Sequence, residues 1–268
     1  MSYNRFVASR DEERYLNTSL AKALGVLDLF NGTSNGLTLT EIARGMGVQP
    51  GSIFSILYTL QRFGYLDRDP ETKRYRLGLK ILTQAHYILS SLDIREQAKP
   101  VLRRLAREME ANTHLAILFE DDVLYLDREE AAPSMVIPSV IGRRVSPHCT
   151  ALGKALLAYN PEVAERILGR GRLPAYTPHT VQEPATLRQE LEQVNERGFA
   201  VDWEEFHEGN VCVAAPVRNY RGHVVAAISV SLMRGRLARE PLERFTHAVV
   251  EGAREVSAYL GLGPDLPS

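Results

Sequence analysis

The spacing of apolar residues between positions 38 and 60 predicts two short helices joined by a tight turn. In the first helix Ile42 and Met46 lie four residues apart, and Gly47 ends the pattern. The second helix carries its apolar residues at the i, i+3, i+4 and i+7 positions of a single face: Ile53, Ile56, Leu57 and Leu60. This face is expected to be buried against the first helix.

Residues at the helix starts support the predicted boundaries, and the exposed face of the second helix suggests a function. Thr38 and Glu41 have the spacing of a capping box, and Pro50 suits the first turn of the second helix. The face opposite the apolar one is small and polar near its start: Gly51, Ser52, Ser55 and Tyr58. An apolar back and a hydrogen-bonding front are what a helix in the DNA major groove requires. An ordinary compact helical hairpin has the same pattern.

The flanking segments favour the DNA-binding interpretation. A helix is expected from residue 19 onward, with an apolar stripe on one side: Leu20, Ala23, Leu24, Leu27 and Phe30. After residue 60, Gly64 ends the second helix, a strand starts at 65–66, residues 69–72 form a turn, and 75–77 form the returning strand. This hairpin carries a cluster of cations: Arg68, Lys73, Arg74 and Arg76. Three helices and a basic hairpin predict a winged helix-turn-helix, although the hairpin alone also fits a solvated turn.

The rest of the chain predicts a second domain with a mixed pattern. Residues 79–92 read as a linker helix, and a further helix has Leu102, Leu105 and Met109 on one face. Strands are expected at 114–119, 123–126, 134–140, 199–202, 211–217 and 223–232. Helices are expected at 151–159, 161–168, 184–197 and 241–260. Hairpins with flanking helices indicate an α/β domain on a mostly antiparallel sheet, and the whole chain an α+β protein of two domains.

Composition and charge narrow the class of protein. Of the 268 residues, 44% are hydrophobic and 24% charged, as in an ordinary globular protein. The chain shows no apolar run long enough to span a membrane and no apolar signal-peptide core at its start, and its two cysteines make no disulfide framework, so we expect a cytoplasmic protein. The net charge is −1, yet residues 1–80 contain eleven Lys and Arg against eight Asp and Glu. A basic excess confined to one small domain suits a regulator whose other domain has a different role. It fits less well a protein whose whole surface is basic and binds nucleic acid.

Several segments together resemble the IclR family of bacterial transcriptional regulators over nearly the whole chain. The matching N-terminal segments are SLAKALGVLDLF, LTLTEIARGMGV and LQRFGYLDRDPETKRYRLGL. The C-terminal ones are VLYLDREE, HCTALGKALLAY, RGFAVDWEE, GNVCVAAPV and HVVAAISVS. The resemblance implies a winged helix-turn-helix at 19–78 after an arm at 1–18, a linker helix at 79–92, a GAF-like effector-binding domain at 93–262, and a tail at 263–268. It also implies homodimers or dimers of dimers that bind a partly palindromic double-stranded operator and a small organic ligand. The small and hydroxyl-bearing residues of the expected pocket suit a small carboxylate or an aromatic acid as that effector.

The resemblance is weakest where DNA would be read. Many members of the family carry a lysine near the start of the recognition helix and a histidine–arginine pair one turn later, where this chain has Pro50, Phe54 and Ser55. A well-made contact of this kind is worth about 1–3 kcal/mol. The expected DNA-contacting residues are Thr38, Gln49, Gly51, Ser52, Phe54, Ser55, Tyr58, Arg62, Arg68, Lys73, Arg74 and Arg76. The alternative is a small-molecule-binding protein whose DNA-binding module is weakened or lost.

An effector pocket is suggested by residue chemistry and by the resemblance. Residues 148–155 form a turn that runs into a helix, where the amides of Ala151 and Leu152 would face a carboxylate; an ordinary capped helix is the other interpretation. Ser229 and Ser231 share one face of a strand, which suits ligand hydrogen bonds as well as plain sheet packing. By resemblance three further residues line the pocket: Ile137, Asp202 and Cys212. Cys212 also fits a small buried apolar residue, and the carboxylate of Asp202 would repel an acid unless it is protonated or paired. Lys154 is expected on the helix surface.

No motif in the chain predicts catalysis, a metal or a cofactor. CxxC, HExxH, GxSxG and GxGxxG patterns do not occur in the sequence. Cys149 follows His148, but adjacent side chains point in different directions and no orienting third group is evident. The sequence therefore predicts a ligand-responsive DNA-binding repressor rather than an enzyme.

Overall fold

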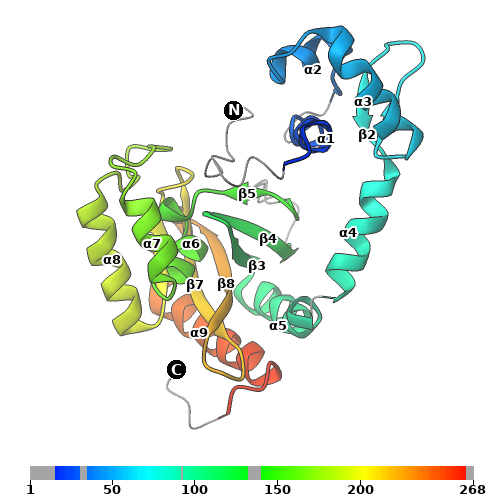
Figure 1. Ribbon diagram of the computed structural model, residues 1–268. Coiled ribbons are helices and arrows are strands. Elements are labelled where there is room, and N and C mark those ends of the chain that lie inside the picture. Colours follow the sequence, from blue (N-terminus) through cyan, green and yellow to red (C-terminus); the bar gives the residue numbers. More distant parts are fainter. Residues whose placement is uncertain (1–15, 31–34, 92, 132–139, 264–268) are drawn as a thin grey trace. The chain divides into compact units, whose positions relative to one another are not determined.

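The computed structural model describes residues 16–30, 35–91, 93–131 and 140–263. The chain divides into two compact units, Met1–Ser91 and Leu92–Ser268, which are coloured blue to cyan and green to red in Figure 1. Within the described parts, no helix combines the length and apolarity needed to cross a membrane.

The first unit consists of small helices and a two-stranded hairpin. Its helices are α1 (Thr18–Asp28), α2 (Leu39–Gly45), α3 (Pro50–Arg62) and α4 (Leu79–Ser91), and its strands are β1 (Leu66–Arg68) and β2 (Tyr75–Leu77). The strands pair antiparallel, with Leu66 opposite Leu77 and Arg68 opposite Tyr75. A bridge between Leu37 and Tyr75 connects the hairpin to the residues before α2. The winged helix-turn-helix predicted from the sequence is confirmed.

The core of this unit is formed by side chains of α1, α2, α3 and the hairpin. Ile42, Ile53 and Leu57 are fully buried, as the apolar spacing predicted, and each such side chain contributes about 1.5–3 kcal/mol. The predicted stripe on α1 is partly wrong. Leu20 and Leu24 are more than half exposed, whereas Phe30 of the predicted stripe is buried and Leu27 packs against the same core. Val26, which was not in the predicted stripe, is fully buried. Helix α1 has apolar residues on two sides, and the side that packs depends on the surface offered by the rest of the unit.

The second unit is built on a six-stranded sheet with the strand order β5-β4-β3-β8-β7-β6. All the strand pairs of the described sheet are antiparallel. The strands are β3 (Asn112–Phe119), β4 (Asp122–Glu129), β5 (Arg144–Val145), β6 (Ala200–Trp203), β7 (Asn210–Arg218) and β8 (Val224–Met233). The predicted antiparallel sheet is confirmed. The short β5 was not predicted, and the strand expected at 134–140 lies outside the described residues except for Val140, which is not in a strand.

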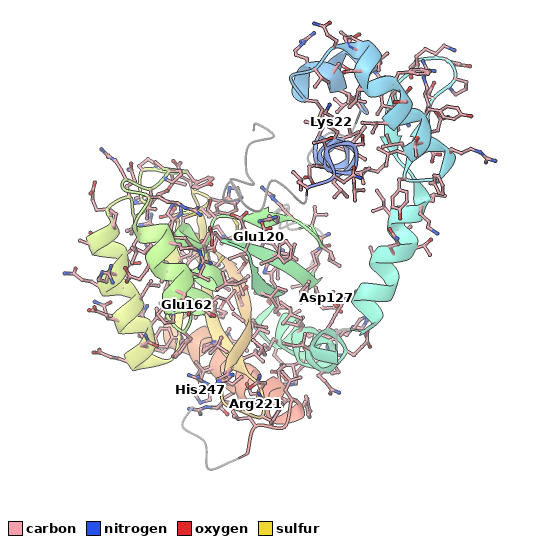
Figure 2. All side chains as sticks on the ribbon, in the orientation of Figure 1. Lys22, Glu120, Asp127, Glu162, Arg221 and His247 are labelled. Carbon is pink, nitrogen blue, oxygen red and sulfur yellow. The ribbon has the colours of Figure 1, made fainter. Side chains whose placement is uncertain are left out.

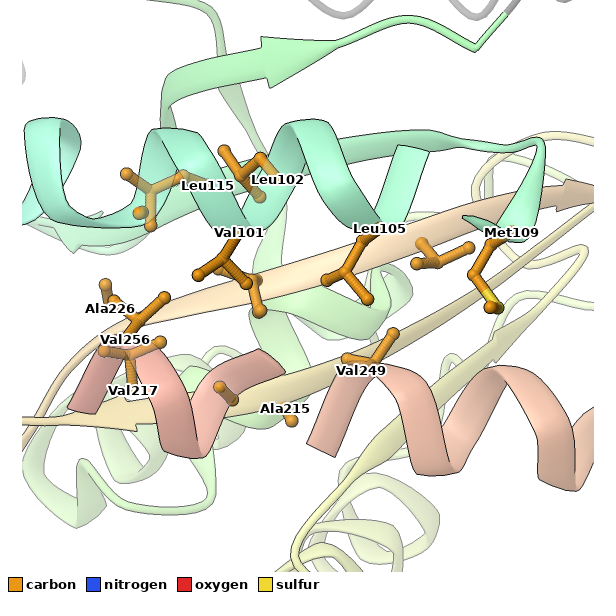
Figure 3. Packing of buried hydrophobic residues seen from close by; sticks show 14 of the residues in the cluster. Val101, Leu102, Leu105, Met109, Leu115, Ala215, Val217, Ala226, Val249 and Val256 are labelled. Atoms are coloured by element: carbon orange, nitrogen blue, oxygen red, sulfur yellow. The ribbon is translucent and has the colours of Figure 1, made fainter. Parts of the chain in front are cut away.

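Two helices cover one face of this sheet. Helices α5 (Asp93–Met109) and α9 (Leu242–Tyr259) enclose the larger core with side chains of β3, β7 and β8. Figure 3 shows Val101 and Leu105 of α5 facing Val249 and Val256 of α9. A Cβ at Gly252 would stand 2.8 Å from a methyl group of Leu105. The two helices therefore approach each other closely only because that position has no side chain.

The other face of the sheet packs against α6 (Ala151–Leu157), and α7 (Pro161–Leu168) and α8 (Pro184–Arg197) form the next layer. Alanines on the strands, among them Ala116, Ala200 and Ala214, let α6 lie close to the sheet. The four helices predicted in this domain after residue 150 are confirmed within two residues at each end. Charged side chains such as Glu162 of α7 and Arg221 of the β7–β8 turn are exposed (Figure 2).

Candidate nucleic-acid interface and ligand-binding site

The start of α2 is fixed by its predicted capping box. The hydroxyl oxygen of Thr38 accepts a hydrogen bond from the amide of Glu41 (3.3 Å), and the Glu41 carboxylate accepts one from the amide of Thr38 (2.7 Å). These bonds satisfy amides that the helix itself leaves unpaired. Thr38 therefore has a structural role, and a contact from it to DNA stays a prediction.

Helix α3 presents the predicted polar front to solvent. Its N-cap is Gln49, Pro50 is in its first turn, and its buried side chains are Ile53 and Leu57. The proposed DNA-contacting residues on or next to this helix are all exposed: Gln49, Gly51, Ser52, Phe54, Ser55, Tyr58 and Arg62. The exposed side chains of Phe54 and Tyr58 offer apolar contact and a hydroxyl at the surface, and Arg62 supplies a cation at the last residue of the helix. This surface can enter a groove without disturbing the core.

The cations of the hairpin are not equivalent. Arg68, Lys73 and Arg76 are exposed. Arg74 instead donates to the carbonyl oxygen of Gly36 (2.8 Å) and forms an ion pair with Glu41 (3.0 Å). Arg74 thus ties the hairpin to the start of α2, which leaves the other three as the better candidates for phosphate contacts.

In the second unit, one pocket on the α6 face of the sheet collects nearly all the predicted effector residues. Its space outside the atoms, including the open mouth, is about 460 Å³. The predicted residues that line it are Ala151, Leu152, Asp202, Cys212, Ser229 and Ser231. Ile137, the predicted apolar wall, lies outside the described residues.

The start of α6 is an ordinary capped helix that also opens onto the pocket. The hydroxyl of Thr150 accepts a hydrogen bond from the amide of Gly153 (3.1 Å). Gly153 is required here, because a Cβ would stand 2.1 Å from the carbonyl oxygen of Pro147. The two preceding amides, of Ala151 and Leu152, belong to the first turn, where a helix offers no internal acceptor. The two interpretations offered by the sequence are therefore compatible, and a carboxylate contact remains a prediction.

The strand register places the polar side chains of the pocket floor in rows. Asp202 pairs with Cys212, and Cys212 with Ser231, so three neighbouring strands contribute one polar row. In the next row Ser229 lies opposite His114, and the Ser229 hydroxyl is 3.3 Å from Nδ1 of that ring. The ring of Tyr125 meets the His114 ring edge-on at 5.5 Å between centroids. The prediction that Ser229 and Ser231 share one face of their strand is confirmed.

Burial changes the acid–base properties of these groups. Burial, with the charge of Glu205 adding to it, raises the pKa of the Asp202 carboxyl to about 7. Burial lowers the pKa of His114 to about 4, and raises that of the Cys212 thiol to about 12. At neutral pH the thiol is protonated and the imidazole neutral, and Asp202 is close to half-protonated. The repulsion expected between Asp202 and an acidic ligand is correspondingly reduced.

The prediction that Lys154 lies on the helix surface is wrong. Its side chain is 2% exposed, and its Nζ lies 2.5 Å from carboxylate oxygens of both Glu205 and Glu190. Burial opposes the charge, but the two carboxylates outweigh it and raise the Lys154 pKa. Helical periodicity did not reveal this position, because α6 is buried all round between the sheet and the outer helices.

This buried cation fixes the loop that carries two pocket side chains. The Glu205 amide donates to Asp202 (2.7 Å), and the Glu205 carbonyl accepts from the Thr180 hydroxyl (2.6 Å). Phe206 and His207 follow directly in the chain and line the pocket. Lys154 therefore acts on the site indirectly, through the side chain of Glu205.

Eight further residues line the pocket: His114, Tyr125, Arg143, Val145, Thr150, Phe206, His207 and Asn210. Asn210 shares the two-residue period of Cys212, so strand alternation alone contained a signal for it. The place of His114 in the pocket follows only from the pairing of β3 with β8, which puts it opposite Ser229. Arg143, Phe206 and His207 lie outside the strands, and their place in the pocket follows from tertiary structure.

A winged helix-turn-helix with an exposed α3, joined in one chain to a domain with a polar pocket, defines a ligand-responsive DNA-binding transcriptional regulator. The chain belongs to the IclR family. Its residues 86–258 match the family model described as bacterial transcriptional regulator IclR C-terminal, and residues 19–70 match the IclR helix-turn-helix domain.

Individual relatives agree with this assignment. The HTH-type transcriptional regulator XynR of Escherichia coli is 37% identical over 91% of this chain and 97% of its own. A crystal structure of an IclR regulator from Alicyclobacillus acidocaldarius is 31% identical with a TM-score of 0.80, covering 92% of this chain and all of its own. An IclR homologue from Microbacterium hydrocarbonoxydans, crystallised with 4-hydroxybenzoate, is 25% identical with a TM-score of 0.80, covering 91% and 99%.

Proposed function

We propose that this protein is a cytoplasmic repressor that binds a partly palindromic operator and changes its occupancy when a small organic acid binds the pocket. The observation that carries this proposal is the pocket, whose floor brings together Asp202, Cys212 and Ser231 from three adjacent strands. The solved relative that holds 4-hydroxybenzoate supports an acid as the effector class.

The proposed DNA contacts divide by chemistry. Gln49, Ser52, Ser55 and Tyr58 would read base edges, and Arg62, Arg68, Lys73 and Arg76 would contact phosphates. Two copies of the chain, as a homodimer or within a dimer of dimers, would place two α3 helices in successive major grooves of a palindrome. Because binding free energies of the two ligands are linked, an effector that favours one arrangement of the DNA-binding units changes operator affinity by its differential affinity for the two states.

The proposal includes no catalytic step. Both cysteines have pKa values raised by burial, so neither supplies a thiolate at neutral pH. The His148 ring nitrogen Nε2 lies 2.9 Å from the carbonyl oxygen of Pro174, and Cys149 is turned toward the carbonyl of Ser146. A cysteine–histidine pair that would act as nucleophile and base is therefore not formed by these two neighbours.

Fluorescence anisotropy with the intergenic DNA upstream of the protein's own gene tests the proposal. We expect a specific complex that weakens steeply with salt and that is lost in the double variant Ser52→Glu and Ser55→Glu, whose exposed positions leave the core intact. A matched control places the same charges at exposed Thr186 and Gln189, on α8 of the other unit. Failure of the wild type to prefer this DNA over competitor DNA would contradict the proposal.

A second candidate has a specific observation in its favour. The exposed face of α3 carries a single cation, Arg62, and Arg74 is engaged by Glu41. A protein that binds the acid but not DNA would give a ligand response in calorimetry together with a negative anisotropy experiment. The two outcomes distinguish this candidate from the repressor.

A further inference from the structure

One turn at the edge of the pocket carries two polar atoms that have no hydrogen-bond partner among the described residues. They are Oδ1 of Asn210 and Nε2 of His207, and both atoms are buried. The Asn210 side chain belongs to a residue that is only 5% exposed. Native proteins pair nearly all their buried polar atoms, so two unpaired ones in the same pocket require an explanation.

The turn holds these two groups close together and in place. The amide of Asn210 donates to the carbonyl oxygen of His207 (3.2 Å), and Gly209 between them has a φ of 77°, which favours glycine. The amide of Gly209 donates to the carboxylate of Glu204 (2.7 Å), which also pairs with Arg234. Both unpaired atoms belong to side chains that line the pocket. The site is thus preorganised before any ligand arrives.

The chemistry of the two groups defines what they can bind. The amide nitrogen of Asn210 donates to the sulfur of Cys212 (2.9 Å), and the side-chain atom without a partner in the described part of the chain is the carbonyl oxygen, which can only accept. Burial and the positive charge of Arg143 lower the pKa of His207, so its ring is neutral and its free nitrogen can accept or donate according to the tautomer. A ligand group placed here must therefore offer a hydrogen to Asn210.

A hydroxyl group meets this requirement better than an ammonium group. A hydroxyl donates one hydrogen to Asn210 and still accepts or donates toward His207. An ammonium group would add a second cation to a pocket that Arg143 already lines. A bare alkyl or aryl carbon would leave the Asn210 oxygen buried without a partner, which strongly disfavours a ligand that lacks the hydroxyl.

We propose that Asn210 and His207 form a subsite for a hydroxyl group of the effector, which is then a hydroxyl-bearing carboxylic acid. This inference rests on the proposed function, in which the pocket binds a small acid. Within that class, Asn210 determines specificity: it selects the hydroxylated acid over the same carbon skeleton without the hydroxyl.

Matched pairs of acids test this subsite on the full-length protein. The pairs are 4-hydroxybenzoate with benzoate, glycerate with propionate, and gluconate with hexanoate. Trp203, the only tryptophan of the chain and the neighbour of Asp202, reports binding by fluorescence, and calorimetry confirms it. We expect the hydroxylated member of at least one pair to bind about tenfold more tightly, equivalent to ~1.4 kcal/mol.

Variants at position 210 then assign the preference to Asn210. Asn210→Leu keeps the approximate shape and removes the acceptor, so we expect the affinity ratio to fall below about threefold. Asn210→Asp keeps an acceptor oxygen; its charge weakens both acids of a pair, so the ratio should persist even though both affinities fall. Asn195→Leu on α8 is the control, because Asn195 is exposed and contacts only the carbonyl of Ala158 among the described polar partners. Thermal unfolding of each variant shows that the domain remains folded.

Two results would overturn the subsite. One is equal affinity for both members of every pair that binds, and the other is a hydroxyl preference that survives in Asn210→Leu. Either result leaves the repressor proposal standing, because an acid still binds. Binding by none of the six acids would instead count against the acid-binding pocket itself, and the subsite would fall with it.

Discussion

The two units carry their functional side chains in opposite ways. In the first unit the candidate DNA-contacting residues stand outside a small core, and Tyr58, for example, is 61% exposed. In the second unit the candidate ligand-contacting residues are inside, and Asp202 is 2% exposed. Function and folding are therefore largely separable on α3 and closely coupled around the pocket.

The difference has a physical cause. Affinity for DNA comes mainly from cations that meet phosphates from solvent, and a cation does this best at the surface. Discrimination among small acids requires desolvated polar groups at fixed positions, because an unpaired buried partner penalises the wrong ligand. The buried groups must be supported by others, such as Lys154 beneath the loop of Glu205 and His207.

The largest expected effect tests this coupling in the second unit. Lys154→Ala leaves Glu205 buried without its cation, and removing one partner of a buried ion pair typically costs ~3–5 kcal/mol. We expect the urea unfolding transition of this unit, followed by Trp203 fluorescence, to move to lower urea by the corresponding amount. The matched control is Arg188→Ala, which removes the exposed partner of Glu165 and should leave the midpoint unchanged. Superimposable unfolding transitions for Lys154→Ala and wild type would contradict the coupling of folding and function around the pocket.

An intermediate effect is expected from pH at Asp202. The folded pKa, about 7, is above the ordinary value near 3.9, so protonated Asp202 favours the folded state at low pH, and this advantage is lost as pH rises from about 4 to 7. Asp202→Asn cannot ionise. We therefore expect the free energy of unfolding of the variant, relative to that of the wild type, to rise by on the order of 2 kcal/mol between pH 5 and pH 8. Urea unfolding of both proteins at the two pH values measures this change. If the free energies of unfolding of variant and wild type differed by the same amount at pH 5 and pH 8, Asp202 would not be buried as described.

The smallest effect is expected in the hairpin of the first unit, where it tests whether DNA-contacting residues can be changed without loss of stability. Arg76→Ala removes an exposed cation, so we expect the slope of log affinity against log salt to become shallower by about 0.9, with unchanged thermal stability. Arg74→Ala removes hydrogen bonds to Gly36 and Glu41, so it should lower the thermal midpoint followed by circular dichroism. If instead Arg76→Ala destabilised the unit and Arg74→Ala did not, the division between contacting and structural cations would be reversed.

Most of the fold and part of the site were predictable from local patterns. The capping box of Thr38 and Glu41, the start of α3 at Pro50 and the bounds of α7 and α8 depend on neighbours a few residues away, and each is confirmed. The shared face of Ser229 and Ser231 depends only on the two-residue period of a strand. By contrast, the packing side of α1 was predicted only in part, because Leu20 and Leu24 continue the stripe of Leu27 and Phe30 and yet are exposed, whereas Val26, outside that stripe, is buried.

The sequence by itself determined the order of the elements, their approximate ends, the division into a winged helix-turn-helix and an α/β domain, and the family. These follow from short-range periodicity, capping and turn chemistry. Only the tertiary structure decided that Lys154 is buried, that Arg74 holds the hairpin to α2, and that His114, His207 and Asn210 meet in one pocket. Burial and long-range pairing join residues far apart in the chain, and the same side chain is a solvated charge or a buried anchor according to what packs over it.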